Sequence, residues 1–471
     1  MVDYNFLPNL RTDTIDPAFR RYIGMTGYLV PPQTASTRIA ATAAKLPKIE
    51  RRLVDNGNFI LIKRISKRFA NTASKLYSMV EHHQKQLKRS VGKNELSPKQ
   101  FQAFQHLAED ITTSVRKTRS LTADSLRRQL SLSPTHLVGY EDITLAIFIS
   151  LNMEEEYLDY PTRYYEGINR TVAREALAVQ AMLSLALKQA YYPVASAMSY
   201  DSAFLAGRIF AQYGIKRVAM GFGAYMADDN YRNVLYVRGQ RIMLPQMMPN
   251  RYVRTAIVAL GFWDGYRAHA GGVPTSFHFL GLGAPIMLPI VALCAYGTRD
   301  LSFDATSPIL DAGEGFFYSD EPAYLKLRAR KIAFALASGK QKSWNCPCGF
   351  CKQFIAKHPL NYEEAHKWFV LRKHSVVNAS DLQPGGDLYT SLPLFSEPKN
   401  TTLRKAVTFA RMGHNHWVLE RIVYRLRDTG GSRSRLIKHL HDITNAYATH
   451  TESQVFAKSI GWVTDFVANK R

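Results

Sequence analysis

Residues Ser276–Pro308 read SFHFLGLGAPIMLPIVALCAYGTRDLSFDATSP. An aromatic and aliphatic run ends at Gly281 and Gly283, an apolar helix-like segment follows, and a short strand-like run then leads to Asp304. This order predicts strand, glycine loop, helix and strand, with a carboxylate at the carboxyl end of the second strand. In (β/α)8 barrels, the chemistry lies at that end of the strands. The alternative is a buried βαβ unit in which Asp304 only caps the following turn.

The rest of the chain repeats this alternation of strand-like and helix-like segments. Strands are expected near Tyr28, Leu53, Ile143, Pro193, Arg217, Phe277 and Leu301. These are seven of the eight strands that a barrel needs. We therefore predict an α/β fold, a (β/α)8 TIM-type barrel spanning residues 26–340. Residues 1–25 look irregular and polar, and we expect them to form an N-terminal leader.

The charge of the chain points to its partner. The net charge is +23 over 471 residues, which favours a nucleic acid, with an anionic membrane surface as the weaker option. The first residues, MVDYNFLPNLRTD, show no basic-then-apolar signal pattern. The longest apolar run, Ala284–Tyr296, contains two prolines and is too short to cross a bilayer. We expect a cytoplasmic protein that does not enter the membrane, and the four cysteines fit a reducing compartment.

A basic helical stretch interrupts the alternation. Residues 60–130 hold 15 Lys or Arg against 5 Asp or Glu, and Leu107, Ile111 and Val115 recur at helical spacing. We predict a helical insertion at residues 60–140 that binds the phosphate backbone. A merely solvated basic face is the alternative. The residues expected to bind nucleic acid are Lys63, Arg64, Lys67, Arg68, Lys88, Arg89, Arg116, Lys117 and Arg119.

Three cysteines fall within six residues of the segment WNCPCGFC. Thiolates at the spacing of Cys346, Cys348 and Cys351 suit a tetrahedral zinc ion. With a fourth protein ligand the ion would be structural, because no position would remain open for water. Cys294 stands alone in an apolar segment and is expected in the core.

The order of four motifs resembles the tRNA-guanine transglycosylases and the related enzymes that insert 7-deazaguanine bases into DNA. LVDNGNF is similar to the family's Thr-Asp-Ser-Gly-Gly-Phe, and VAMGFGA to its Val-Gly-Gly-Leu-Ala. FHFLGLG followed by LSFDATSP is similar to its His-Tyr-Leu-Met-Gly-Val-Gly and Met-Phe-Asp-Cys pair. CPCGFC falls where the family binds zinc. The family's fourth ligand opens a His-Asn pair, which implies His414, with His374 as the alternative.

This resemblance implies a chemistry that uses two carboxylates. Asp304 would attack the sugar and hold it as a covalent intermediate, as in retaining glycosidases. Asp55 would move protons to and from the bases, although Asn-Gly-Asn replaces the family's Ser-Gly-Gly after it. An acidic residue should read the base, and we expect this to be Asp159, with Glu154 and Glu155 behind it. The remaining base-binding residues are expected to be Ser196, Gly221, Gly223, Gly281 and Gly283.

Three functions follow from the resemblance and the charge. The first is a pentosyltransferase that exchanges guanine in DNA for a 7-deazaguanine such as preQ0, with or without helper proteins. The second is a tRNA-guanine transglycosylase. The third is a non-catalytic nucleic-acid-binding subunit of the same fold. The basic insertion favours DNA. The expected domains end with a zinc-binding subdomain at 341–430 and a C-terminal helical region at 431–471.

Overall fold

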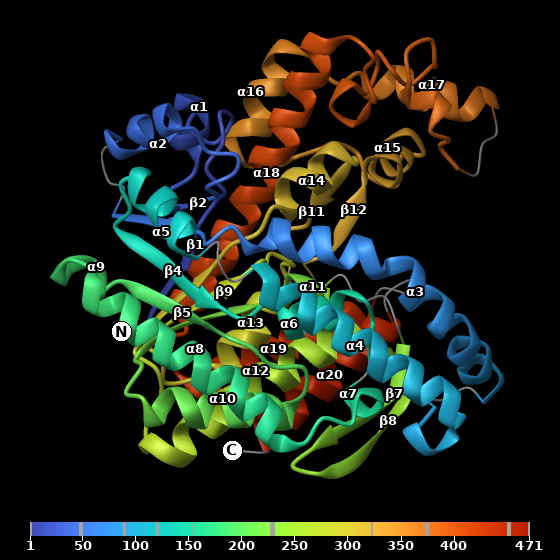
Figure 1. Cartoon of the computed structure of the whole chain (residues 1–471). Helices are drawn as coiled ribbons and strands as arrows, with labels where there is room; N and C mark the ends of the chain where they lie inside the picture. The colour runs from blue at the N-terminus through green and yellow to red at the C-terminus, as the bar shows by residue number, and fades with distance from the viewer. Residues whose placement is uncertain are drawn as a thin grey trace.

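The computed structural model describes residues 2–46, 50–87, 91–118, 122–153, 155–226, 231–321, 324–372, 376–449 and 454–469. At its centre lies a parallel sheet of eight strands in the order β1-β10-β9-β6-β5-β4-β3-β2 (Figure 1). The strands are β1 (Asp3–Phe6), β2 (Gly27–Val30), β3 (Arg51–Val54), β4 (His136–Glu141), β5 (Tyr191–Ala195), β6 (Arg217–Gly221), β9 (Ser276–Leu280) and β10 (Asp300–Phe303).

The sheet is curled, so that its two edge strands approach each other. Just after β1, the N–H of Leu10 donates to the carbonyl of Leu29 in β2 at 2.8 Å, and the N–H of Leu29 donates to the carbonyl of Pro8 at 3.1 Å. Side chains from six neighbouring segments form one small apolar cluster inside the curl, namely Leu7, Leu29, Leu53, Val138, Val194 and Ala219. An α/β fold with a curled parallel sheet is thus confirmed.

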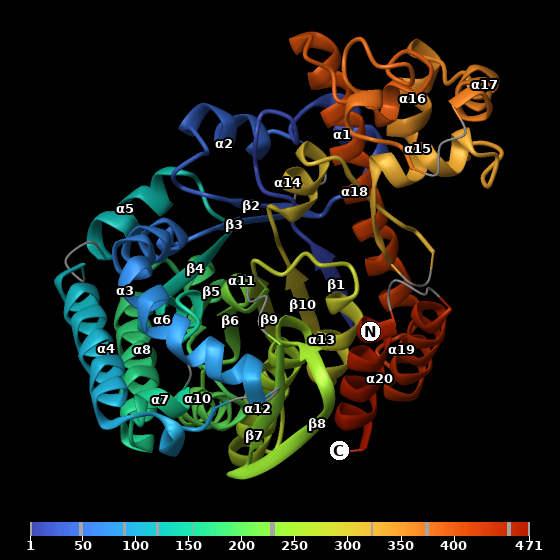
Figure 2. The same ribbon diagram turned by 90° about the vertical axis from the view of Figure 1, so that its right-hand side faces the viewer.

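Helices surround the outer face of this sheet (Figure 2). Strand alternation directs Phe277 and Phe279 of β9 outward, where the ring of Trp263 lies 4.3 Å from that of Phe277. A Cβ on Gly207 would lie 2.0 Å from the carbonyl of Phe262, so α10 and α12 cross closely. The covering helices include α2 (Thr37–Ala44), α8 (Thr162–Met182), α9 (Leu185–Lys188), α10 (Tyr200–Gln212), α12 (Asn250–Ala270) and α13 (Met287–Cys294).

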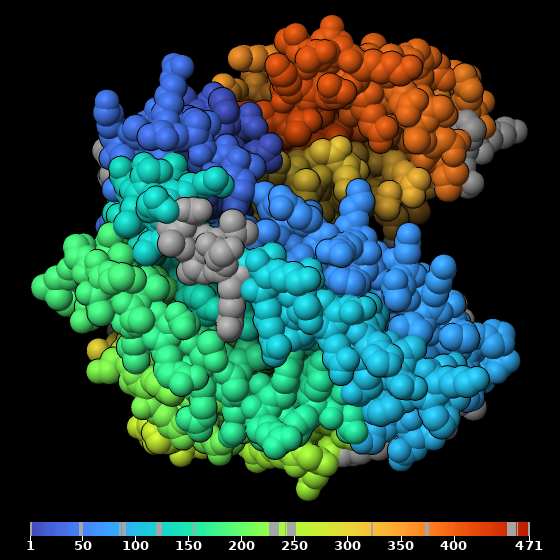
Figure 3. All heavy atoms as spheres, in the orientation of Figure 1, coloured from blue at the N-terminus to red at the C-terminus, as the bar shows by residue number. Residues whose placement is uncertain are grey.

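The basic stretch is helical, as predicted, and its main helices are three. They are α3 (Asn58–Leu87), α4 (Pro98–Thr118) and α5 (Thr122–Ser131). The apolar face of α4 is buried at Leu107, Ile111 and Val115. Residues of α3 and α4 cover the face of the molecule beneath the orange part of the chain in Figure 3.

The chain after β10 builds a second apolar core above the sheet. Phe317, Phe350 and Phe395 belong to this core. Its elements are α14 (Ser307–Gly313), β11 (Phe316–Tyr318), β12 (Lys326–Arg328), α15 (Ala329–Ala337), α16 (Gly349–Lys357), α17 (Tyr362–Arg372) and the long α18 (Thr401–Asp428). Two more helices follow, α19 (Arg433–Ala448) and α20 (Gln454–Asn469).

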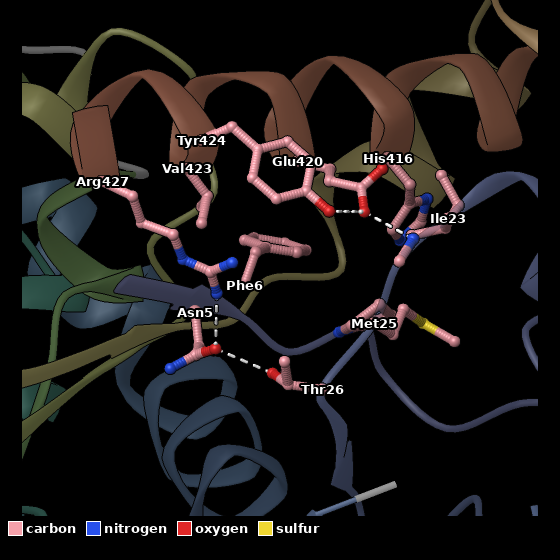
Figure 4. Close-up of a pocket in the computed structure, with 12 residues that line it drawn as sticks. Asn5, Phe6, Ile23, Met25, Thr26, His416, Glu420, Val423, Tyr424 and Arg427 are labelled. Atoms are coloured by element: carbon pink, nitrogen blue, oxygen red, sulfur yellow. Dashed lines mark hydrogen bonds between the residues drawn. The ribbon is translucent and has the colours of Figure 1, made fainter. Parts of the chain in front are cut away.

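Helix α18 connects this second core to the first strand of the sheet (Figure 4). The guanidinium of Arg427 donates to the carbonyl of Tyr4 at 2.7 and 2.9 Å and to Oδ1 of Asn5 at 3.0 Å. Further back on the same helix, Glu420 accepts hydrogen bonds from the N–H of Gly24 and the hydroxyl of Tyr424. A small cavity of about 20 Å³ lies between these groups. The first and last parts of the chain are therefore tied together.

Two expectations about secondary structure are wrong. Residues 1–25 are not irregular, because they contain β1 and α1 (Pro17–Tyr22), and β1 pairs along β10. The apolar run after Asp142 is not a strand but α6 (Thr144–Ser150), which follows β4. Short apolar runs do not distinguish a buried strand from a buried helix. The hairpin of β7 (Tyr231–Val237) and β8 (Gln240–Pro249) was not anticipated.

Candidate functional site

Three carboxylates meet at one end of the sheet. Asp55 follows β3, Glu141 ends β4 and Asp304 follows β10. The carboxyl ends of parallel strands share one edge, which is where barrel and open-sheet enzymes hold their reactive groups. Burial, together with the nearby charges of Asp304 and Glu141, raises the pKa of Asp55 to about 7. The three groups therefore lie within electrostatic reach of one another.

Asp304 is almost fully buried and is held through one oxygen. Its Oδ1 accepts the N–H of Gly281 at 3.0 Å and lies 3.1 Å from Nε2 of His278. Nδ1 of His278 lies 2.8 Å from the hydroxyl of Ser302. If that hydroxyl donates to Nδ1, Nε2 carries the hydrogen that Asp304 accepts. Among the described residues, Oδ2 of Asp304 has no hydrogen-bond partner, so this oxygen can face a substrate.

The Asn-Gly-Asn turn after Asp55 organises the neighbouring carboxylate. Gly57 has a φ of +79°, which permits the tight turn into α3. The side-chain amides of Asn56 and Asn58 donate to Oε2 of Glu141 at 3.1 and 3.0 Å. Asp55 itself accepts the N–H of Asn56 at 2.9 Å. The two asparagines of this turn thus hold Glu141 in place.

Glu141 was not among the site residues predicted from the sequence. Burial raises its pKa, against the effect of the hydrogen bonds from Asn58 and Asn56. Its Oε1 lies 4.0 Å from the place where a Cβ on Gly221 would stand. The strand was expected near Ile143, so the residue that ends the real strand at position 141 was not considered as a strand-end acid. Placing the strand at 136–141 would have found it.

The predicted glycines form close loop contacts around Asp304. Gly221 ends β6 and Gly223 begins α11 (Gly223–Met226). Gly281 has a φ of +71°, and a Cβ there would lie 3.2 Å from the backbone of Gly223. A Cβ on Gly283 would lie 2.3 Å from that of Ala305. Side chains at Gly281 and Gly283 would therefore push the loops apart.

Three other residues predicted to bind the base make contacts with the protein instead. Asp159 does not follow a strand, because α7 (Glu155–Leu158) precedes it, and its exposed carboxylate pairs with Lys93 at 2.6 Å. Ser196 follows β5, but its hydroxyl donates to the carbonyl of Asp142 at 2.9 Å. Burial raises the pKa of Glu155, whose carboxylate hydrogen-bonds to Ser199. Glu154 lies outside the described residues.

A second cluster joins three thiols and one imidazole. Nδ1 of His414 lies 3.2, 3.5 and 3.7 Å from the sulfurs of Cys346, Cys348 and Cys351. All four potential ligand atoms lie within 4.8 Å of one another. The other ring nitrogen of His414, Nε2, bonds to the carbonyl of Tyr318 at 2.8 Å, which directs Nδ1 at the sulfurs.

This cluster has the composition of a structural metal site. Hydrogen bonds from Cys348, Cys351 and His414 lower the pKa of Cys346, which favours the thiolate that metals bind. Three sulfurs and one nitrogen at such distances suit a four-coordinate ion. His414 was the preferred fourth ligand, and it is the histidine that the structure brings to the cysteines. His374 lies outside the described residues, and Cys294 is buried elsewhere, as expected.

Neither known protein families nor curated proteins provide a match for this chain. Within the described ranges, no helix combines the length and apolar character needed to cross a membrane.

The basic residues of the insertion lie at the surface. Lys63, Arg64, Lys67 and Arg68 are partly or fully exposed on α3, as are Arg116 and Lys117 on α4. The ammonium of Lys63 lies 4.5 Å from the ring centre of Phe59, one residue after Asn58. The positive surface thus begins next to the strand-end carboxylates. Lys88, Arg89 and Arg119 lie outside the described residues.

The raised pKa of Asp55 leads to a prediction about stability. The folded state binds this proton more tightly than the unfolded chain, whose reference pKa is 3.8. The contribution of Asp55 to stability therefore falls as pH rises from about 4 to about 7. We expect Asp55→Asn to be stabilising at pH 8, on the order of a few kcal/mol, and much less so at pH 5.

Thermal unfolding of both proteins across this pH range measures the difference. Asp159→Asn, which removes an exposed carboxylate, is the matched control. An Asp55→Asn effect that is the same at pH 5 and pH 8 would show that Asp55 is not neutralised by its surroundings.

Proposed function

We propose that this chain is a base-exchange transglycosylase that replaces guanine in DNA with a 7-deazaguanine such as preQ0. The observation that carries the proposal is the pairing of Asp304 with Asp55 at the same end of the sheet. One carboxylate is held by two donors and keeps an oxygen free, and the other has a pKa near 7. Two carboxyl groups in different environments can divide nucleophilic and acid–base roles.

In the first half of the reaction, Oδ2 of Asp304 attacks the C1′ atom of the target nucleotide. The C1′–N9 bond breaks, and protonated Asp55 gives its proton to the departing guanine. His278 and the N–H of Gly281 keep Asp304 in position during the attack. In the second half, Asp55 takes the proton from N9 of the incoming base, which attacks C1′ and releases Asp304. The inversion at each step gives overall retention.

Glu141 takes the base-reading role in place of Asp159. A carboxylate accepts the adjacent N–H donors on the edge of a guanine-like base. Its oxygen Oε1 faces the loop of Gly221, where the missing side chain leaves room for a flat ring. Asn56 and Asn58 fix the other oxygen, so the carboxylate is preorganised for the base.

The fold supports this interpretation in two further respects. The contact between Leu10 and Leu29 would close the curled sheet into a TIM-type barrel, with the three carboxylates at its carboxyl-terminal face. Zinc is the metal that best suits Cys346, Cys348, Cys351 and His414. It would hold the subdomain together and take no part in the exchange.

DNA is favoured over tRNA because the exposed basic side chains of α3 begin beside the site. A base in a duplex must leave the stack before Asp304 can reach its sugar, and a grip on the backbone would hold the strand meanwhile. The alternatives are a tRNA enzyme with the same chemistry and a binding subunit without activity. The three strand-end carboxylates favour an enzyme.

The exchange can be tested directly by incubating the protein with DNA or tRNA and free preQ0, then analysing digested nucleosides by mass spectrometry. We expect the 7-deazaguanine nucleoside in DNA. Incorporation only into tRNA would contradict the choice of DNA. Incorporation into neither would favour the binding subunit. Glu141→Gln should lose incorporation, whereas Asp159→Asn should keep it.

The basic face of α3 gives a separate prediction about binding. Replacing Lys63, Arg64, Lys67 and Arg68 together by alanine should weaken duplex DNA binding. It should also make the plot of log K against log salt shallower, by about 0.9 for each phosphate that the variant no longer neutralises. Fluorescence anisotropy at several salt concentrations measures this slope. Arg174→Ala with Lys188→Ala removes two exposed charges from α8 and α9 and is the control. Equal slopes in both variants would place the grip elsewhere.

A further inference from the structure

A cavity of about 340 Å³ lies where the helical insertion meets the sheet. Its walls come from the turn between β3 and α3, the first turns of α3, the end of α4, α5, the end of β4 and α8. Its size falls at the lower end of the range for small-molecule pockets. It adjoins the candidate site, because Asn56, Asn58 and Glu141 belong to both.

The lining combines flat and apolar walls with two cations. Tyr140 and Tyr191 contribute aromatic surface, and Leu61, Val115 and Val179 contribute aliphatic surface. Arg64 and Arg128 also line the cavity and are exposed. In the part of the chain that the structure describes, neither guanidinium has a hydrogen-bond or ion-pair partner. Two unengaged guanidinium groups at a pocket suit a phosphate, which arginine binds with two parallel hydrogen bonds.

We propose that this cavity binds one nucleotide, with its phosphate on Arg64 and Arg128 and its base against Tyr140 and the aliphatic wall. The charges determine the orientation. Glu141 repels a phosphate, so the phosphate lies away from this carboxylate, whose free oxygen faces the exchanged base. Arg64 lies six residues after Asn58 on α3, which is about 9 Å along the helix axis. A separation of this size suits a nucleotide that spans from its base to its 5′-phosphate.

The nucleotide site is additional to the position at which the proposed exchange takes place. The exchanged nucleotide would contact Asp304 and Gly221, neither of which lines this cavity, whereas Arg128 of α5 and Val179 of α8 do. The occupant is either a free mononucleotide or a neighbouring nucleotide of the bound strand. Both present the same phosphate and base. Binding of a nucleotide in this cavity does not depend on base exchange.

Binding of guanosine 5′-monophosphate to the full-length protein tests the site, by titration calorimetry without any nucleic acid. We expect saturable binding, with guanosine at least about tenfold weaker, since it lacks the charged phosphate that the two guanidinium groups would bind. Arg128→Ala should weaken the binding of guanosine monophosphate by a similar factor and leave the binding of guanosine almost unchanged. Arg174→Ala, which removes an exposed guanidinium from α8 outside the lining, should change neither.

A second variant tests the cavity itself. Val179→Trp should fill the space and abolish binding of both compounds, and thermal unfolding checks that the variant is folded. No binding at millimolar concentration, or equal affinity of guanosine and its monophosphate, would overturn the proposal. So would unchanged affinity in Arg128→Ala. If a short single-stranded oligonucleotide displaces the monophosphate, the natural occupant is a nucleotide of the bound strand. If it does not compete, the natural occupant is a free nucleotide.

Discussion

Replacing Asp304 with asparagine is expected to lower base exchange by about 10³-fold or more, because the variant lacks the proposed nucleophile. The amide oxygen of asparagine can still accept the hydrogen bonds from His278 and the N–H of Gly281. The fold should therefore persist, and binding of DNA should change little. Single-turnover release of guanine, followed by chromatography, measures the loss at the step that forms the covalent bond.

The wild-type protein should also form a protein–DNA adduct that survives denaturation, and Asp304→Asn should not. Asp159→Asn is the matched control, since it makes the same substitution at an exposed carboxylate. Full exchange activity in the Asp304→Asn protein would show that Asp304 is not the nucleophile. Loss of both activity and folding in this variant would instead give the residue a structural role.

Removal of one of the four proposed metal ligands should have the second large effect. Cys348→Ala or His414→Ala should reduce bound zinc from about one ion per chain to nearly none, because a tetrahedral site needs all four ligands. Since metal binding at such sites contributes directly to folding, the residues around the second apolar core should unfold at a markedly lower temperature. Elemental analysis of the purified protein and thermal unfolding measure the two effects.

Cys294→Ala is the control for this experiment. Its thiol is fully buried among apolar residues, away from the four-residue cluster, so the variant should keep its metal. Unchanged zinc after His414→Ala would show that another group, such as His374, completes the site. Unchanged stability after complete loss of zinc would show that the ion does not hold this part of the chain together.

The parts of the fold that could be predicted are those with a long apolar pattern or with turn residues at both ends. Residues 60–130 repeat an apolar face over many turns, so their helices were predictable. β1 is only four residues long and pairs with β10, almost three hundred residues away in the chain. No local sequence pattern indicates which strand β1 pairs with. The run after Asp142 misled because an apolar segment of seven residues suits α6 as well as a strand.

The site shows the same division. Asp304 and the three cysteines lie in short motifs that indicate a strand end and a metal site. They could therefore be selected as site residues from the sequence alone. Glu141 could not be selected without the correct end of β4, because its role depends on amides from the neighbouring β3–α3 turn. His278 was not among the residues predicted from the sequence. Its position as the partner of Asp304 depends on strand pairing between β9 and β10.

The link between Arg427 and Tyr4 has a consequence for the order in which the protein matures. These residues are separated by 423 positions, so β1 leaves the ribosome long before the side chain that secures it. Until α18 has been synthesised, the strand lacks this anchor and its neighbourhood stays open to other partners. Ribosome-bound chains that stop before Thr401 should therefore recruit chaperones more strongly than chains that extend past α18.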